Sequence, residues 1–236
     1  MKIIDNLPQH LEDNTANPEW LAVRAGKFTG SDFHQYLGIT GKGLSETAES
    51  NLYKKVLESI GYEFDGVRSD AMERGNELEP EARQQYIMET FNDVEEVAFV
   101  DWEKMRAGCS PDGVIVRREL TRTSPRTFAC GNVVGVDDEY VSEKIEKIIE
   151  IKCPEIKNYL KMASGKIPPV YMTQMQYNML ITGAKSCDFV VYHPDMRLIV
   201  REIVADAEYQ QVILTALEKL NARYDEILEQ IKEYKL

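Results

Sequence analysis

The order of apolar patterns along the chain predicts an α/β fold with a mixed central β-sheet flanked by helices. Near both ends of the chain, apolar residues recur every three or four positions, as in amphipathic helices. Between about residues 95 and 205, short runs rich in β-branched residues indicate strands, with one further helical segment between them. The resulting order is helices, strand, strand, helix, strand, strand, helix.

Length and composition fit a single globular domain over residues 1–236. With 43% hydrophobic and 29% charged residues, the chain can bury one substantial core. Residues 1–16 are polar and irregular, and we expect them to form a loose arm. No apolar run approaches about 18 residues, and the N-terminus lacks the apolar segment of a secretory signal. We therefore expect a cytoplasmic protein without membrane spans.

The first two elements are short helices. Asn17 and Pro18 provide a cap and a first helical residue, and the helix they open ends at Gly26. The sequence Thr-Gly-Ser-Asp then begins a second helix at Ser31, which runs through Leu37. The amides and hydroxyls at its start form either an anion site or a plain helix cap.

Two longer helices follow. Ser45 caps an amphipathic helix to about Ile60, and Ser69 opens a charged helical stretch that contains Glu79. Pro80 interrupts this stretch, so we expect a kink or a fresh start there. The residues expected to form its buried stripe are Leu78, Ala82 and Tyr86.

The middle of the chain changes to an apolar period of two. Runs at 97–99, 105–109 and 113–118 predict strands. The segment 117–147 is interpreted as an added hairpin, with a strand over 128–136. Its arginines either contact DNA or belong to a solvated loop: Arg117, Arg118, Arg122 and Arg126.

The last third begins with a short helix over 158–163 and a helix over 169–181 whose methionines are expected in the core. Strands over 186–192 and 197–204 follow. One long helix in the segment 206–236 would cover the sheet or form a subunit interface.

Net charge and cysteine content limit the classes of protein. With 40 acidic and 28 basic residues the net charge is −12, which is unfavourable for binding phosphates unless basic residues line one channel. The four cysteines form no Cys-x-x-Cys pair, so neither structural zinc nor an iron–sulfur cluster is expected. Three of them lie in strand-like runs and are expected to be buried: Cys109, Cys153 and Cys187.

The segment 148–154, Ile-Ile-Glu-Ile-Lys-Cys-Pro, carries the main chemical signal. Glu150 and Lys152 lie at i and i+2 of a strand and point to the same face, where they could form an ordinary ion pair. Upstream, Ser-Pro-Asp-Gly at 110–113 presents Asp112 at the start of another strand. Two carboxylates and a lysine suit Mg²⁺-assisted phosphodiester hydrolysis, in which the carboxylates hold the cation and the lysine acts on the attacking water.

These two motifs resemble the Asp…Glu-x-Lys core of nucleases, and in particular the family of phage lambda exonuclease and the YqaJ-type viral recombinases. The resemblance extends from about residue 18 to 205 and implies a restriction-endonuclease-like fold. The residues outside the core that carry it are Trp20, Arg24, Ser31, Gly75, Glu79, Ala82, Arg83, Tyr171, Met172, Gln174, Gln176 and Tyr177.

The resemblance implies catalytic roles for five residues: Asp112, Glu150, Lys152, Glu79 and Gln174. Asp112 and Glu150 would ligate two Mg²⁺ ions, joined by the backbone carbonyl of Ile151, and Mn²⁺ could substitute. To act as a base, Lys152 needs a lowered pKa, which a nearby metal cation could provide.

By the same resemblance, Arg24, Ser31 and Ser110 would hold a DNA 5′-phosphate, and Met72 would occupy the position of an apolar wedge between terminal base pairs. The chain also departs from the family. No clear basic residue follows the helix of Ser31, because Gly41 and Lys42 fall near that position, and the long insert has no counterpart.

The implied function is a Mg²⁺-dependent 5′-to-3′ exonuclease. It would act on double-stranded DNA ends and leave 3′ single-stranded tails for phage-type recombination. The resemblance also implies a ring-shaped homotrimer and a single-strand annealing protein as partner. Two alternatives are a restriction-like endonuclease, which would cut closed circular DNA, and an inactive nuclease-fold scaffold that binds DNA.

Overall fold

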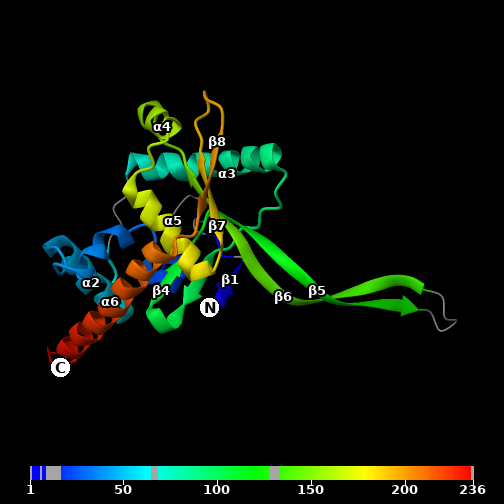
Figure 1. The fold of residues 1–236 in the computed structure, drawn as a ribbon. Coiled ribbons are helices and arrows are strands. Elements are labelled where there is room, and N and C mark those ends of the chain that lie inside the picture. Colours follow the sequence, from blue (N-terminus) through cyan, green and yellow to red (C-terminus); the bar gives the residue numbers. More distant parts are fainter. Residues whose placement is uncertain (1, 6, 9–16, 65–68, 128–132, 235–236) are drawn as a thin grey trace.

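The structure is a computed structural model. It describes residues 2–5, 7–8, 17–64, 69–127 and 133–234, with the backbone alone over 119–127 and 133–142. Its strands form two mixed four-stranded sheets surrounded by helices (Figure 1). The predicted α/β class with mixed strand pairing is therefore confirmed, although the strands are divided between two sheets.

The first sheet has the order β1-β3-β4-β2 and is built from short strands. The pairs β1–β3 and β3–β4 are antiparallel, whereas β4 and β2 are parallel. Its strands are β1 (Lys2–Ile4), β2 (Phe28–Thr29), β3 (Phe99–Trp102) and β4 (Ala107–Cys109). The expectation of a loose arm over 1–16 is wrong for residues 2–4, because their backbone pairs with β3; residues 1, 6 and 9–16 lie outside the described part.

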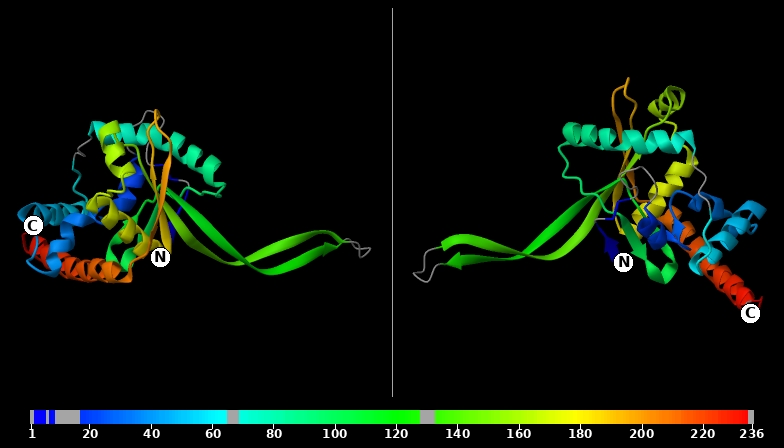
Figure 2. Two further views of the ribbon diagram at one scale, coloured as in Figure 1. Left: turned by 45° about the horizontal axis from the view of Figure 1, so that its top comes forward. Right: turned by 180° about the vertical axis from the view of Figure 1, so that it is seen from behind.

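The second sheet has the order β5-β6-β7-β8. The strands β6 and β7 are parallel, and the other two pairs are antiparallel. Its strands are β5 (Gly113–Thr127), β6 (Val133–Lys152), β7 (Ser186–Val191) and β8 (Ile199–Val204). Beyond the part of β6 that pairs with β7, β5 and β6 continue as a two-stranded ribbon that projects away from the body (Figures 1 and 2).

Helix α5 (Pro169–Thr182) contacts strands of both sheets, including β4 and β6. Eight of its 14 residues are buried, and Met175 and Met179 of its predicted methionine stripe lie in the core. Helix α6 (Ala207–Tyr234) packs against α5, α2 (Glu46–Ser59) and the 3₁₀ helix η1 (Phe33–Thr40). A second short 3₁₀ helix, η2 (Glu103–Met105), and helix α4 (Ile156–Ala163) complete these layers.

The N-terminal helices follow their capping signals. Helix α1 (Pro18–Arg24) has Asn17 as its cap, and the Ser45 side chain accepts a hydrogen bond at the start of α2. The second predicted helix differs: it is the 3₁₀ helix η1, which begins at Phe33, two residues after Ser31. Thr29 belongs instead to β2, because pairing with β4 holds it in an extended conformation.

Helix α3 (Asp70–Thr90) is one continuous helix with Pro80 inside, so the alternative of a fresh start at Pro80 is wrong. Ala82 and Tyr86 are fully buried, and they pack with Leu78 against a second hydrophobic cluster that includes Ile149 and Ile151 of β6. Burial of this apolar stripe offsets the backbone hydrogen bond that the proline removes.

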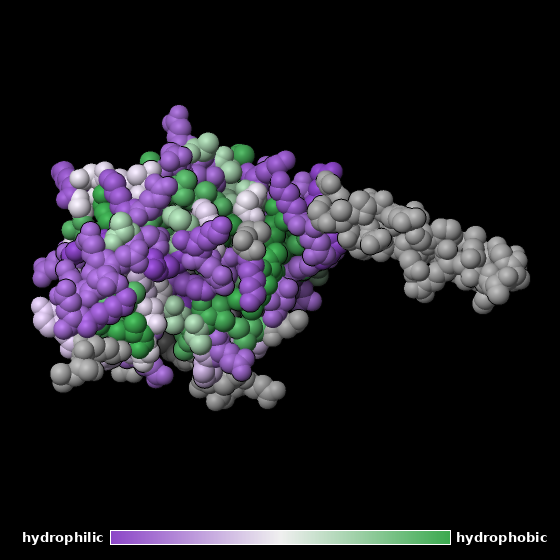
Figure 3. Space-filling model, turned by 90° about the horizontal axis from the view of Figure 1, so that it is seen from below, coloured by the Kyte–Doolittle hydropathy of each residue, from purple (hydrophilic) through white to green (hydrophobic). Residues whose placement is uncertain are grey.

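Alternation along β6 sorts its side chains between two cores. Ile149 and Ile151 face the cluster beneath α3, whereas Ile148 belongs to the main core. Ile145 also belongs to the main core, because the register of β5 and β6 shifts between Lys147 and Ile145. The predicted burial of Cys109, Cys153 and Cys187 is confirmed, and all three are free thiols. On the face in Figure 3, hydrophilic side chains surround smaller hydrophobic areas. No helix in the described ranges is long and apolar enough to cross a membrane.

Candidate active site

The turn at Asp112 joins the two sequence motifs that lie 38 positions apart. Gly113 pairs with Ile149 in the β5–β6 ladder, so the start of β5 lies beside the end of β6. The backbone N–H of Asp112 donates to Ile149 O over 3.1 Å. In return, Ile151 N–H donates to the Asp112 carboxylate Oδ2 over 2.6 Å. The fold thus places the first carboxylate directly against the Glu-x-Lys strand.

Glu150 and Lys152 share one face of β6, as their spacing predicts. Lys152 Nζ donates to Glu150 Oε1 in an ion pair, and Lys152 also lies over the ring of Tyr171, 5.1 Å from its centroid. Glu150 is completely buried. Burial raises the pKa of the Glu150 carboxyl to about 7, against the opposing effect of Lys152.

The Lys152 ammonium lies between two carboxylates. Burial lowers the pKa of its ammonium, but the Glu150 and Asp112 carboxylates outweigh this effect, and the net pKa is raised above its ordinary value. The lowered pKa required of a base is therefore absent from the protein alone. The Glu150 carboxylate has one further donor, the Asn178 amide Nδ2, at 3.3 Å.

Arg83 holds the third carboxylate, Glu79, on the other side of Asp112. Its guanidinium donates to Glu79 Oε1 over 2.5 Å, to the Asp112 backbone oxygen over 2.8 Å, and to Glu96 Oε1 over 2.8 Å. Burial, followed by repulsion from Asp112, raises the pKa of Glu79 to about 8. Arg83 therefore connects α3, the Asp112 turn and the segment before β3.

The donor set fits a hard divalent cation in its chemistry. Burial raises the pKa of all three carboxyls, Asp112, Glu150 and Glu79, which shows that negative charge here lacks compensation from solvent. As they stand, these carboxylates face protein donors, and no three Asp, Glu, His or Cys side chains of the described residues converge as metal ligands. A divalent ion held by Asp112 and Glu150 would supply Lewis-acid chemistry at this site.

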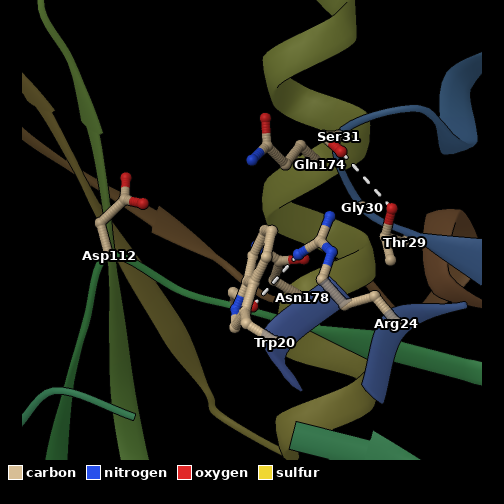
Figure 4. A pocket seen from close by; sticks show the side chains of 9 residues that line it. Trp20, Arg24, Thr29, Gly30, Ser31, Asp112, Gln174 and Asn178 are labelled. Atoms are coloured by element: carbon tan, nitrogen blue, oxygen red, sulfur yellow. Dashed lines mark hydrogen bonds between the residues drawn. The ribbon is translucent and has the colours of Figure 1, made fainter. Parts of the chain in front are cut away.

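A pocket of about 150 Å³ lies on one side of Asp112. In Figure 4, Asp112 lies across this pocket from Thr29 and Ser31, while helix α5 supplies Gln174 and Asn178. The full lining is Trp20, Arg24, Thr29, Gly30, Ser31, Ser110, Asp112, Gln174 and Asn178.

Arg24 makes this pocket suitable for an anion. Its guanidinium stacks on Trp20, 4.1 Å from the ring centroid, and NH1 donates to Ser110 Oγ over 3.2 Å. Burial lowers the pKa of Arg24, and it pairs with none of the carboxylates in the described ranges. A buried guanidinium without a carboxylate partner favours a negatively charged ligand.

The hydroxyls of Thr29 and Ser31 lie 3.5 Å apart at the far wall of the pocket. Thr29 Oγ1 also donates to Asp32 Oδ1 over 3.2 Å. Because η1 begins only at Phe33, Ser31 does not stand at a helix start, and the expected contribution of helix amides at this residue is wrong. The remaining side-chain donors are the hydroxyls, the guanidinium and the Gln174 amide.

A second pocket, of about 350 Å³, is also lined by Asp112. Glu79, Arg83 and Glu96 supply its polar wall, and Leu7 and Pro8 border it. Asp112 borders both pockets, whereas the predicted residues of β6, Glu150, Ile151 and Lys152, line neither of them. Met72 lines neither pocket; it is exposed on the first turn of α3.

Two residues of the site were missed in the sequence. Asn178 follows Gln174 by four positions, so on a helix both lie on one face, and that spacing could have indicated it. Glu96 has no local signal, because only the fold brings it to Arg83.

In the ribbon, Arg117 lies 3.9 Å from Glu146, and Arg118 pairs with Glu95 and Glu143 at 2.7 and 2.8 Å. The side chains of Arg122 and Arg126 lie outside the described part.

The chain is similar to known proteins in both sequence and fold. Residues 19–185 match the family model of the YqaJ-like viral recombinase domain. A structure of LHK-Exo in complex with dAMP is similar over 92% of this chain and 97% of that chain, at 27% identity and a TM-score of 0.71. A second structure, of the alkaline exonuclease LHK-Exo from Laribacter hongkongensis, is similar over 93% of this chain and 100% of that chain, at 27% identity and a TM-score of 0.66.

A phage related exonuclease from Haemophilus somnus 129PT shares 16% identity over 87% of this chain and 96% of its own, with a TM-score of 0.53, which shows the fold alone. No curated protein sequence matches the chain. The family match covers most of the chain and includes both motifs, so the resemblance seen in the sequence is confirmed. This chain belongs to the family of YqaJ-like viral recombinase domains.

Proposed function

We propose that this chain is a Mg²⁺-dependent exonuclease that degrades duplex DNA from its ends in the 5′-to-3′ direction and leaves 3′ single-stranded tails. The observation that carries this proposal is the position of Asp112. Its carboxylate accepts from Ile151 N–H beside the Glu150–Lys152 ion pair, and it also borders the pocket of Arg24. A phosphate held by Arg24 would place the following phosphodiester beside the carboxylates.

The similarity to alkaline exonucleases supports hydrolysis of DNA as the reaction class. One of these neighbours holds dAMP, a mononucleotide of the kind that stepwise cleavage would release. We assign two Mg²⁺ ions, for which Mn²⁺ could substitute, to Asp112, Glu150 and the carbonyl of Ile151, with Glu79 nearby.

The side chains of this chain then have separate tasks. Arg24, Ser31, Ser110 and Gln174 bind and orient the terminal 5′-phosphate through charge-assisted hydrogen bonds. Lys152 orients the attacking water, and it could receive a proton only after a bound cation has lowered its pKa. Met72, exposed on α3, would separate the terminal base pair.

A net charge of −12 is compatible with this assignment, because local rather than total charge meets the substrate. The pocket of Arg24 is bordered mainly by donors, whereas many of the acidic residues lie elsewhere. A ring-shaped homotrimer that encloses the product strand, and a single-strand annealing protein as partner, belong to the same proposal by family.

The test is to incubate linear duplex and covalently closed circular DNA side by side with Mg²⁺. We expect loss of the linear duplex, release of mononucleotides and intact circles. Cleaved circles would instead indicate a restriction-like endonuclease. Binding of linear DNA without turnover would indicate an inactive scaffold.

A further inference from the structure

Asn178 connects the wall of the Arg24 pocket to the buried carboxylate of Glu150. The side chain lies on α5, is only 2% exposed, and lines the pocket beside Gly30. Its amide Nδ2 donates to Glu150 Oε2 over 3.3 Å. The other Glu150 oxygen accepts from Lys152, so these two donors restrain both ends of the carboxylate.

The orientation of the Asn178 amide follows from its neighbour. A carboxylate oxygen needs a donor, so the NH₂ group faces Glu150, and the carbonyl oxygen Oδ1 faces the opposite way. Oδ1 is buried and has no hydrogen-bond partner among the described residues. Buried amide oxygens normally have partners, which makes this one unusual.

Gly30 lies against that unpaired oxygen. A Cβ at Gly30 would lie 2.3 Å from Asn178 Oδ1 and 3.2 Å from its Cγ. The shorter of these two distances is one that non-bonded atoms cannot adopt. Gly30 does not have a positive φ, so the close approach, rather than the backbone conformation, requires glycine here. The turn of Thr29 and Ser31 therefore packs directly on the amide that holds Glu150.

We propose that Asn178 is a positioning residue that fixes Glu150 for metal binding, and that the turn at Gly30 holds Asn178 in place. The inference rests on the proposed function and deepens it. Ser31, which would bind the phosphate, and Gly30, which packs against Asn178, belong to the same turn. The position of a catalytic carboxylate is thereby linked to the wall of the phosphate pocket.

The first experiment replaces Asn178 by leucine, which has a similar size but cannot donate. We expect the Mg²⁺ concentration for half-maximal rate to rise and kcat to fall, each by about tenfold or more, the scale found for groups that orient metal ligands. The ratio of rates on 5′-phosphorylated and 5′-hydroxyl ends should stay unchanged, because Arg24 is intact. Calorimetric titration of Mg²⁺ in the absence of DNA should show the same loss of affinity.

The matched control is Asn221→Leu. Asn221 is also a hydrogen-bonded asparagine on a helix, where it donates to Met105 O over 2.8 Å, but it lies on α6. The Asn221→Leu substitution should lower thermal stability and leave Mg²⁺ affinity at the wild-type value. If Asn178→Leu does not fold, Asn178→Ala, which only removes atoms, gives the same comparison. Wild-type Mg²⁺ affinity in a folded Asn178 variant would overturn the inference.

The second experiment is a double-mutant cycle with Gly30→Ala. In the wild type, the new methyl group must displace the Asn178 amide, and we expect weakened Mg²⁺ binding as in Asn178→Leu. In the Asn178→Ala background, the amide is gone and Tyr177 Cδ1, at 3.2 Å, remains the close neighbour, so the additional effect on Mg²⁺ binding should be at least about fivefold smaller, as expected for residues in contact. An equal effect in both backgrounds would show that Gly30 does not act through Asn178. Failure of the wild type to degrade linear duplex would contradict the proposed function, whereas Mg²⁺ titrations test the positioning role independently of turnover.

Discussion

The two pockets beside Asp112 each contain an arginine, and the two arginines differ in their partners. Arg83 is fully engaged, by Glu79, Glu96 and the Asp112 carbonyl, at 2.5 to 2.8 Å. Arg24 stacks on Trp20 and donates to the Ser110 hydroxyl, without a described carboxylate partner. One guanidinium therefore stabilises the protein itself, whereas the other remains available to an anionic ligand.

This difference shows why the total charge of the chain is a poor guide to its ligand. Both arginines are largely buried. Protein carboxylates compensate the charge of Arg83, whereas the charge of Arg24 is left for solvent or an anionic ligand to compensate.

The largest effect is expected from Asp112→Asn and Glu150→Gln. Both should abolish hydrolysis in Mg²⁺, because each removes a charged ligand. The asparagine oxygen can still accept from Ile151 N–H, so the fold should persist. The measurement is release of acid-soluble nucleotides by purified variants with native circular dichroism spectra. Turnover by either variant would refute the assignment of the site. Calcium should permit DNA binding without turnover, since its looser coordination positions water poorly.

Lys152→Ala should lower turnover by about a hundredfold or more, the usual contribution of general acid–base catalysis. Mg²⁺ affinity should not fall, because lysine is not a ligand and its removal frees Glu150 from an ion pair. Single-turnover rates and calorimetric Mg²⁺ titrations separate the two quantities. Normal turnover would leave Lys152 as only the structural partner of Glu150.

Arg24→Ala should slow digestion of 5′-phosphorylated ends far more than digestion of 5′-hydroxyl ends, by about tenfold or more for one lost charge-assisted contact. The measurement is the initial rate on matched linear duplexes that differ only at the 5′ end. Equal loss on both substrates would make Arg24 a general DNA contact or a fold residue.

Arg83→Gln is the matched substitution in the other pocket, and it should leave the ratio of rates on the two ends unchanged. Glu79 would lose its ion pair, and we expect the free energy of unfolding to fall by about 1–3 kcal/mol, the usual effect of removing one partner of a buried polar contact. Urea denaturation measures this value. A selective loss on phosphorylated ends would mean that Arg83 also binds the terminal phosphate.

The smallest effect concerns pH. Burial raises the pKa of Glu79 to about 8 and that of Glu150 to about 7, so above their ordinary pKa the folded protein binds more protons than the unfolded chain. The free energy of unfolding in EDTA should therefore decrease as pH rises from about 5 to about 8. Glu79→Gln should reduce this slope while keeping an oxygen for Arg83. Equal slopes in wild type and variant would contradict the raised pKa of Glu79.

Local sequence determined most secondary structure and the shared face of Glu150 and Lys152. Caps at Asn17 and Ser45 and the alternation along β6 act over a few residues, and the physics of those spacings is the same in any fold. The family resemblance added the order of the motifs. Where the local signals were weak or competed with packing, expectation failed, as for β1 at Lys2–Ile4 and for η1, which begins two residues after Ser31.

Only the tertiary structure decided which side chains meet. The bond from Ile151 N–H to Asp112 depends on the register of β5 and β6, and the ion pair of Arg83 with Glu96 depends on how α3 lies against the start of β3. The contact of Gly30 with Asn178 depends on close packing of β2 and α5. Such contacts join residues far apart in sequence, and their distances are set by the packing of whole elements, which no local pattern encodes.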